Sequence, residues 1–372
     1  MKKALSLFFM AALLFCQSES CWGRMQPDIR QGHYYYGPDD TYQHMSVKKG
    51  LQFLVTHTLS PQHLVKAIVS HFYSVDKPKQ PDAPEILNPT QMVPAGTSIN
   101  PKIVWIGHAS FLIQVDGFNI LTDPIFGDVK VGPFTITRRM IKPGILFKNL
   151  PHIDAIVISH NHSDHVDTQT LSALAKEYDP IIYVPEGNKA LFEGMGFSHI
   201  VENTWWEQNQ LSGKHGGITI TCLPARHWSI RFSLTSYRKS LWTSWMISAH
   251  NMHIYFAGDT GYGPHFKEIA EDFSSIDIAL MPVAPTQEEE GKNIHKEYHV
   301  DAREAVDAFI DLGAHCFIPM HYGTFFGKDH SIFPLKVLND SWKKQQRVLD
   351  NKTLLIARCG QEYDLMDIFN KS

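Results

Sequence analysis

The hexapeptide His160-Asn161-His162-Ser163-Asp164-His165 brings three imidazoles and one carboxylate into six consecutive residues. It follows the apolar run of residues 153–159, which predicts a buried strand. Its side chains therefore stand at the carboxyl end of a strand, where α/β sheets build their sites. In this spacing His160 and His162 can reach one divalent ion while Asp164 and His165 turn toward a second. Nitrogen donors with one carboxylate favour zinc over magnesium or calcium.

The alternative is a run of solvated histidines in a chain that has 21 of them, and further ligands decide between the two. Three more candidates each follow a predicted strand: His227, Asp259 and His321. Any one of them alone would more often be a structural residue. Together with the hexapeptide they supply seven metal-ligating side chains at corresponding strand ends, which indicates a metal site.

Seven ligands exceed what one tetrahedral zinc ion takes but fit two ions, with Asp259 bridging them. We assign three ligands to the first ion: His160, His162 and His227. The second ion takes three others: Asp164, His165 and His321. Two ions that share a bound water lower its pKa toward about 7, so hydroxide forms at neutral pH. We therefore expect two Zn²⁺ ions per chain, with Asp164 and Asp259 among the catalytic residues.

The composition is that of an ordinary soluble globular protein. The 372 residues are 43% apolar and 19% charged, which is enough for a sizeable core. A formal net charge of -4 argues against a nucleic-acid partner, which would need a basic face. The five cysteines form no CxxC pair, so neither a disulfide scaffold nor a thiolate zinc site is indicated. Cys222 and Cys316 lie in apolar strand-like runs and are expected to be buried, inert thiols.

The amino terminus predicts an exported protein. Met1-Lys2-Lys3 and the apolar residues 4–15 have the form of a signal peptide, which we expect to cover residues 1–20 with a cut before Cys21. A lipid anchor at Cys16 or Cys21 is the weaker alternative. The protein is thus expected in the periplasm or outside the cell.

Residues 21–100 form an extension in front of the catalytic domain. Residues 34–38 suggest loop and turn, whereas Ser60-Pro61 begins a helix with an apolar face up to Phe72. This helix is expected to pack on the catalytic domain, with docking on a membrane as the alternative. Six prolines between residues 77 and 101 predict a strap or linker.

The catalytic domain is expected to span residues 101–372. Short strands at residues 103–106, 111–115 and 118–121 precede units in which strand and helix alternate. The clearest helices are residues 168–178, capped by Asp167, and residues 302–312, which end at Gly313. Two rounds of antiparallel strands followed by β/α units predict two sheets face to face with helices outside.

The ligand pattern resembles that of the metallo-β-lactamase fold over residues 100–360. More narrowly, the chain resembles the N-acyl-phosphatidylethanolamine-hydrolysing phospholipases D. The matching stretches are residues 105–110 (WIGHAS), 121–126 (LTDPIF), 158–165 (ISHNHSDH), 204–207 (TWWE), 227–228 (HW), 256–262 (FAGDTGY), 299–301 (HVD) and 321–325 (HYGTF). The resemblance implies an α/β protein, an αβ/βα sandwich with a dinuclear zinc site at one edge. The first hundred residues match the family weakly.

The resemblance also implies roles for residues around the metals. Asp123 would stand behind them as a third catalytic aspartate that orients a ligand histidine. The alternative role for Asp123 is that of a turn residue before Pro124. His299 would lie near a substrate phosphate, and His108 would line the cleft. Several aromatic residues could cover acyl chains, although core packing is the expected role of most: Trp205, Trp206, Trp228, Trp242, Trp245, Phe325 and Phe326. Three basic residues could meet a phosphate or an anionic membrane, or stand in a solvated loop: Arg138, Arg139 and Lys142.

The function expected from this resemblance is zinc-dependent phospholipase D-type hydrolysis. Attack of the bridging hydroxide on phosphorus would release an N-acylethanolamine and leave phosphatidic acid, and peripheral contact with a membrane is a possible further interaction. Another phosphodiester, or a lactone or other ester, is the alternative substrate class for the same metals. A metal- or lipid-binding envelope protein without activity is disfavoured, because the ligand set is complete.

Overall fold

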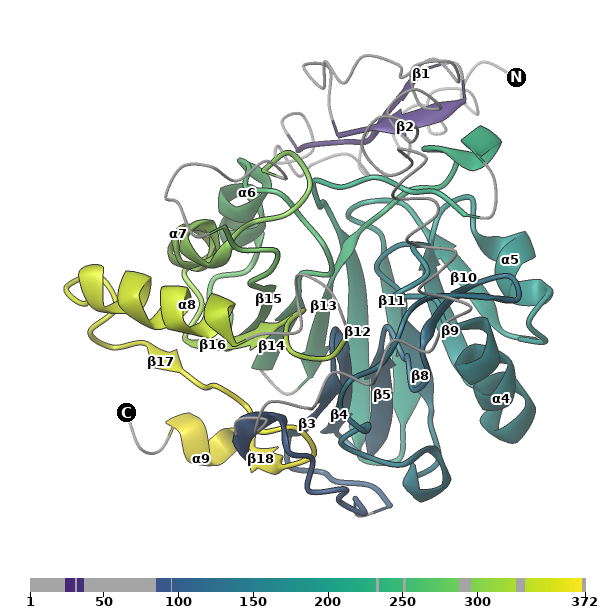
Figure 1. Ribbon diagram of the computed structural model, residues 1–372, viewed down its shortest axis with the longest axis horizontal. Coiled ribbons are helices and arrows are strands. Elements are labelled where there is room, and N and C mark those ends of the chain that lie inside the picture. Colours follow the sequence, from purple (N-terminus) through teal and green to yellow (C-terminus); the bar gives the residue numbers. More distant parts are fainter. Residues whose placement is uncertain are drawn as a thin grey trace, which may run out of the picture.

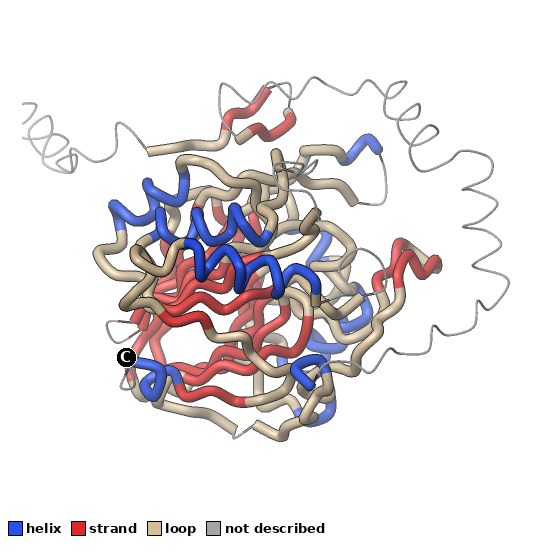
Figure 2. The backbone as a smooth tube through the Cα atoms, turned by 60° about the vertical axis from the view of Figure 1, so that its left-hand side comes forward, coloured by secondary structure: helices blue, strands red, loops and turns tan. Residues whose placement is uncertain are grey.

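The computed structural model describes residues 24–30, 32–36, 85–94, 96–231, 234–249, 252–287, 296–325 and 332–369. Two seven-stranded sheets lie face to face in it, with helices on the outer side of each (Figure 1). Figure 2 shows the same layers from another side, with blue helices outside the red strands. The α/β sandwich expected from the sequence is therefore confirmed. The predicted signal peptide, the helix expected from Ser60 and Phe326 lie outside the described residues.

The first sheet has the order β10-β9-β8-β5-β4-β3-β18. Its antiparallel part consists of β3 (Lys102–Gly107), β4 (Ser110–Val115) and β5 (Phe118–Thr122), with β18 (Glu362–Asp364) at the edge beside β3. Its parallel part consists of β8 (Ala155–Val157), β9 (Ile181–Pro185) and β10 (Ile200–Asn203).

The second sheet has the order β11-β12-β13-β14-β15-β16-β17 and repeats this plan. Antiparallel strands come first: β11 (Gln208–Gly213), β12 (Gly216–Leu223), β13 (Ser244–Ala249) and β14 (Met252–Phe256). Parallel strands follow: β15 (Ile278–Pro282), β16 (Cys316–Met320) and β17 (Thr353–Leu354). In both sheets the carboxyl ends of the parallel strands point to the same edge of the sandwich.

The helices divide between the two outer faces. The first sheet carries α4 (Thr168–Tyr178) and α5 (Lys189–Glu193), and the second carries α6 (His265–Asp272), α7 (Ala302–Leu312) and α8 (Phe333–Lys344) (Figure 1). A short α9 (Leu365–Phe369) follows β18. The described 3-10 turns are Glu85–Leu87, Phe147–Asn149 and Leu234–Ser236.

Alternation along the strands explains why the layers form. In β3, Ile103 and Trp105 join the large cluster between the sheets, whereas Val104 and Ile106 join a second cluster under α4 and α5. Successive side chains of a strand point to opposite faces, so a strand that is apolar at every position is covered on both. Cys222 and Cys316 are buried as expected, and burial raises the pKa of the Cys316 thiol to about 12. None of the described helices has the length and apolar character needed to cross a membrane.

Two parts of the amino-terminal extension pack on the sandwich. β1 (Asp28–Arg30) and β2 (His33–Tyr35) form a hairpin, so the expectation of loop at Tyr34 is wrong. Tyr34 N–H donates to the Arg238 carbonyl at 2.8 Å, which pairs this hairpin with the loop between β12 and β13. Leu87 is buried in the large core cluster, so this part of the predicted proline-rich linker is packed rather than extended in solvent.

Candidate metal centre

The predicted ligands lie in the loops that leave the carboxyl ends of four strands. The hexapeptide follows β8, while His227, Asp259 and His321 follow β12, β14 and β16. Because β8 belongs to one sheet and the other three strands to the second, the site bridges the two halves of the sandwich. Most of these side chains are fully buried, which excludes the alternative of solvated histidines.

One group of donors consists of His160, His162 and His227. His162 Nδ1 lies 2.9 Å from His160 Nε2 and 3.2 Å from His227 Nε2. A tetrahedral zinc ion with nitrogen ligands at about 2.0–2.1 Å sets those nitrogens about 3.3 Å apart. The sequence assigns the same three residues to the first ion.

The hydrogen bonds behind these imidazoles determine which ring nitrogens carry protons. Ser159 Oγ donates to the Asp123 carboxylate at 2.5 Å, so it accepts from His160 Nδ1 at 2.8 Å. His227 Nδ1 donates to the Tyr298 carbonyl at 2.9 Å. The Nε2 atoms of His160 and His227 therefore carry lone pairs, and both face His162 Nδ1. One N–H cannot satisfy both, whereas a cation among the three nitrogens would, so these residues fit a metal ion.

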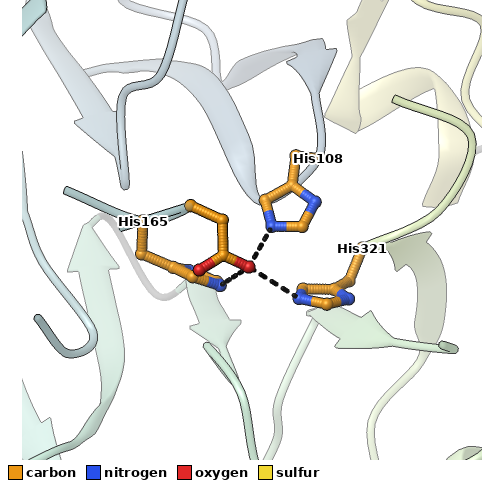
Figure 3. A group of neighbouring side chains, drawn as sticks. His108, His165 and His321 are labelled. Atoms are coloured by element: carbon orange, nitrogen blue, oxygen red, sulfur yellow. Dashed lines mark ion pairs between the residues drawn. The ribbon is translucent and has the colours of Figure 1, made fainter. Parts of the chain in front are cut away.

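The second group consists of His108, Asp164, His165 and His321. Figure 3 shows the imidazoles of His108, His165 and His321 converging on one carboxylate oxygen, and its dashed lines mark the ion pairs that this oxygen forms with them. Asp164 Oδ2 lies 3.5 Å from His108 Nε2, 3.8 Å from His165 Nε2 and 4.0 Å from His321 Nε2. Three of these residues are the predicted ligands of the second ion. His108 joins them as a further donor that the sequence placed at the cleft instead.

Asp259 lies between the two groups. Its Oδ2 is 3.2 Å from His165 Nε2, 3.8 Å from His160 Nε2 and 3.9 Å from His227 Nε2. Its Oδ1 is 3.2 Å from His321 Nε2. One carboxylate thus faces donors of both groups, which is the position that a bridging ligand needs.

Asp123 holds the second group from behind. It is fully buried, and its Oδ2 accepts from His165 Nδ1 at 2.7 Å, which leaves His165 Nε2 to face the site. Its Oδ1 accepts from the backbone N–H of Ser159 at 2.7 Å. Asp123 therefore orients His165 directly and His160 through the Ser159 hydroxyl. The sequence singled out Asp123 but not Ser159.

The backbone around the site is strained in several places. His108, Asp123 and His321 have φ values of 55°, 31° and 64°, in the left-handed region that residues other than glycine adopt infrequently, although Asp and His do so more often than most. At Gly258 (φ +58°), an added Cβ would lie 2.4 Å from the Ser159 Cβ. Glycine is thus required there for the loop of Asp259 to reach the hexapeptide.

The electrostatics favour neutral imidazoles in the first group. Burial lowers the pKa of His162 to about 4 and holds the pKa values of His160 and His227 well below their usual range. Burial alone would raise the pKa of Asp259, but His165, His321 and His299 around it hold that pKa well below its usual value. Neutral imidazoles and ionised carboxylates are the forms that bind metal ions.

The two substrate-binding candidates are placed differently. His299 is the more accessible, with 18% of its side chain exposed and its Nδ1 3.8 Å from Asp259 Oδ2. His108 is only 1% exposed and sits among His165, His321 and Phe325. It therefore lies with the second donor group rather than on an open cleft wall.

Four of the candidate aromatic residues are buried: Trp205, Trp242, Trp245 and Phe325. Trp228 is half-buried and packs on His162, with ring centroids 4.4 Å apart. Trp228 is therefore the tryptophan of this set in contact with a candidate ligand.

One arginine differs from expectation, and another lies at the site although the sequence did not predict it there. The Arg139 guanidinium donates to the carbonyls of Ile106, Ile125 and Ile141 at 2.8–2.9 Å, so this residue is neither a phosphate ligand nor part of a solvated loop. Arg231, which sequence reasoning did not single out, is buried within 3.3 Å of the Ser163 hydroxyl. It reaches the hexapeptide only through the fold, and no local pattern marks it.

The chain is similar to several known proteins. An N-acyl-phosphatidylethanolamine-hydrolyzing phospholipase D of Caenorhabditis elegans is 31% identical over 230 residues, 59% of this chain and 63% of that protein. The mitochondrial protein of that name in Saccharomyces cerevisiae is 33% identical over 224 residues, 59% of this chain and 47% of that protein. An uncharacterised protein of Mycobacterium tuberculosis is 34% identical over 237 residues, 62% of this chain and 60% of that protein. The chain therefore spans less than two thirds of the length of these relatives.

Solved structures share the fold. A metallo hydrolase of the archaeon Ignicoccus hospitalis superposes with a TM-score of 0.52 at 21% identity, over 71% of this chain and 97% of that one. An isothiocyanate hydrolase from Delia radicum gut bacteria gives a TM-score of 0.52 at 19% identity, over 70% of this chain and 98% of that one. The profile of the Beta-lactamase superfamily domain matches residues 118–322, more than half of the chain. The chain belongs to the metallo-β-lactamase superfamily and has the fold of its metal-dependent hydrolases.

Proposed function

We propose that this protein is a metal-dependent phosphodiesterase of phospholipase D type. Its substrates would be N-acyl-phosphatidylethanolamine-like phospholipids, and its products phosphatidic acid and an N-acylethanolamine. The observation that carries the proposal is the pair of donor groups that meet at Asp259, with no nucleophilic serine or cysteine side chain needed. The names of the relatives in Caenorhabditis elegans and Saccharomyces cerevisiae support the choice of substrate.

The donor groups would hold two ions, and the nitrogen-rich set favours Zn²⁺. Three residues would hold the first: His160, His162 and His227. The second would take Asp164, His165 and His321, with Asp259 shared between the ions. When bound, such a pair activates water at neutral pH and neutralises the charge of a phosphodiester.

The protein's own residues would orient the substrate and move the proton. In the hydrolysis, the bond between phosphorus and the ethanolamine oxygen breaks, and the departing oxygen needs a proton. His299 fits this task, because it lies beside Asp259 and is more exposed than four of the ligand imidazoles, those of His160, His165, His227 and His321. Asp123 and Ser159 would keep the ligand rings in the tautomers described above.

The test is a direct assay of the chain from Cys21 onward, without the predicted signal peptide, loaded with zinc and mixed with N-acyl-phosphatidylethanolamine in detergent. Phosphatidic acid is measured by mass spectrometry for the parent protein, for Asp259→Asn, and for Asp340→Asn on the exposed face of α8 as the matched control. We expect product from the parent and the control, and none from Asp259→Asn.

The other outcomes separate the parts of the proposal. Full activity of Asp259→Asn would overturn the shared-ligand site. No product from a parent that binds about two ions per chain, the number this donor set fits, would leave the site in place and remove the lipid substrate. Lactones and small phosphodiesters are then the substrates to screen.

A further inference from the structure

A hairpin beside the metal centre exposes apolar side chains on one face. It consists of β6 (Val129–Val131) and β7 (Phe134–Thr137). Phe134 is 61% exposed and Ile136 63% exposed, although residues of these types are usually buried. Because alternate residues of a strand share a face, Phe134 and Ile136 point the same way, with the exposed Arg138 next in that series.

Basic residues predominate in the hairpin and in the segment that follows it, although Asp128 directly precedes β6 and accepts from the backbone N–H of Arg139 at 2.8 Å. Residues 129–153 contain five basic residues and no acidic one, in a chain whose formal net charge is -4. The Arg139 guanidinium already donates hydrogen bonds to three backbone carbonyls, as described above. The exposed cations are Arg138, Lys142 and Lys148. Exposed apolar side chains followed closely in the chain by exposed cations match the interface of an anionic bilayer, where apolar groups enter the acyl boundary and cations meet the headgroups.

The hairpin is fixed to the metal centre at its base. Arg139 forms an isolated β-bridge with Phe325, and Met140 N–H donates to the Thr324 carbonyl at 2.8 Å. Phe325 in turn packs on His108, with ring centroids 5.0 Å apart. A surface that held the hairpin would therefore hold the loop of His321 close to it.

We propose that the β6–β7 hairpin docks the protein on an anionic phospholipid bilayer, with Phe134 and Ile136 entering the interface and Arg138 and Lys142 meeting the headgroups. This inference rests on the proposed function, because a membrane is where a phospholipid substrate resides. It adds which surface of the molecule faces the lipid.

Vesicle binding by the full chain tests the proposal without any need for turnover. Co-sedimentation is measured with vesicles of phosphatidylcholine containing phosphatidylglycerol, and with phosphatidylcholine alone. The apolar variant is Phe134→Ser/Ile136→Ser, matched by Val93→Ser/Val348→Ser at positions that are 69% and 61% exposed elsewhere. The charge variant is Arg138→Gln/Lys142→Gln, matched by Lys336→Gln/Lys343→Gln on α8.

We expect the parent and both controls to bind the anionic vesicles. The apolar variant should bind at least about tenfold more weakly, as loss of two buried apolar side chains implies. The charge variant should lose its preference for anionic over neutral vesicles. Hydrolysis of substrate in detergent should be unchanged in both, whereas hydrolysis in vesicles should fall in parallel with binding.

Three results would overturn the inference. The first is that the parent does not bind vesicles, and the second is that the hairpin variants bind vesicles as strongly as their controls. The third is that the hairpin is needed for binding to an acidic protein, while the parent does not bind vesicles. Binding that depends on the hairpin, in a parent that cleaves no phospholipid, would support the docking surface and contradict the proposed function. The two proposals can therefore fail separately.

Discussion

The Ser159 hydroxyl connects a histidine of the first donor group, through Asp123, to a histidine of the second. Ser159 Oγ donates to Asp123 and accepts from His160, while Asp123 accepts from His165. The sequence predicts the ligands, because each is a metal-binding residue type at the end of a strand. It gives no sign that Ser159 connects them, because serine is common and its contact with Asp123 arises only when the loops after β5 and β8 meet.

Replacement of this hydroxyl should weaken metal binding. In Ser159→Ala, His160 Nδ1 loses its acceptor, so the tautomer that presents Nε2 is no longer favoured. We expect about 10–100-fold weaker binding, as found when residues behind metal ligands are removed. Competition with a chelating dye measures the affinity. Ser98→Ala, remote from the site, is the control, and an unchanged affinity in Ser159→Ala would contradict the connection.

His265 should make the protein sensitive to acid. It is buried, its Nδ1 bonds the Tyr36 hydroxyl at 2.7 Å, and burial lowers its pKa from 6.5 to about 3. Between these two values the unfolded chain binds a proton that the folded protein does not, so the free energy of unfolding falls as the pH falls. The expected slope from one such group is up to about 1.4 kcal/mol per pH unit.

Urea unfolding at several pH values below 6.5, the usual pKa of this imidazole, tests this expectation. The slope of the free energy of unfolding against pH should be shallower in His265→Gln than in the parent. His199→Gln, at an exposed position, should keep the parent slope. Identical slopes in all three proteins would show that His265 takes no part.

At the scale of elements, the sequence predicts α7 residue for residue but misses α8. α7 begins with a capping box, in which Asp301 accepts from Glu304 N–H at 3.0 Å and the Glu304 side chain accepts from Asp301 N–H at 3.1 Å. It ends at Gly313, so the expected residues 302–312 are confirmed. α8 begins at Phe333, after an N-cap residue, Ile332, that has no capping side chain, and the sequence analysis missed it.

Loss of this cap should destabilise the fold. In Asp301→Ala the first backbone N–H groups of α7 lose their acceptor, and α7 covers the second sheet. We expect the free energy of unfolding to fall by about 1–2 kcal/mol in urea denaturation. Asp340→Ala, exposed within α8, should change it by less than about 0.5 kcal/mol. If both variants lost the same free energy of unfolding, the cap could not be the cause.

At the scale of the whole molecule, the two sheets could be predicted but the extra donor could not. The alternation of side chains along the strands and the repeated order of strands and helices can both be recognised in the sequence, so they predict the sandwich. The placement of His108 beside Asp164 depends on the turn between β3 and β4, where a histidine adopts φ 55°. Such a conformation follows from tertiary packing and has no local signal.

Because the donors come from both sheets, metal removal should weaken the whole fold. A ligand that binds only the folded protein stabilises it by about 4 kcal/mol at a thousand times its Kd. We expect a chelator to lower the Tm in differential scanning fluorimetry and added zinc to restore it. Asp259→Asn should respond less to both. A Tm that is the same with and without chelator would contradict a site that joins the sheets.

The last strand of the first sheet has a consequence for synthesis. β18 pairs with β3, and Lys102 and Glu362, which are 260 residues apart, form an ion pair at 2.7 Å. Contacts this distant in sequence form late. Until the carboxyl-terminal residues have emerged from the ribosome, β3 is an open strand edge able to pair with other chains. A chain shortened before β18 should therefore aggregate, and we expect the nascent protein to need protection until β18 has been made.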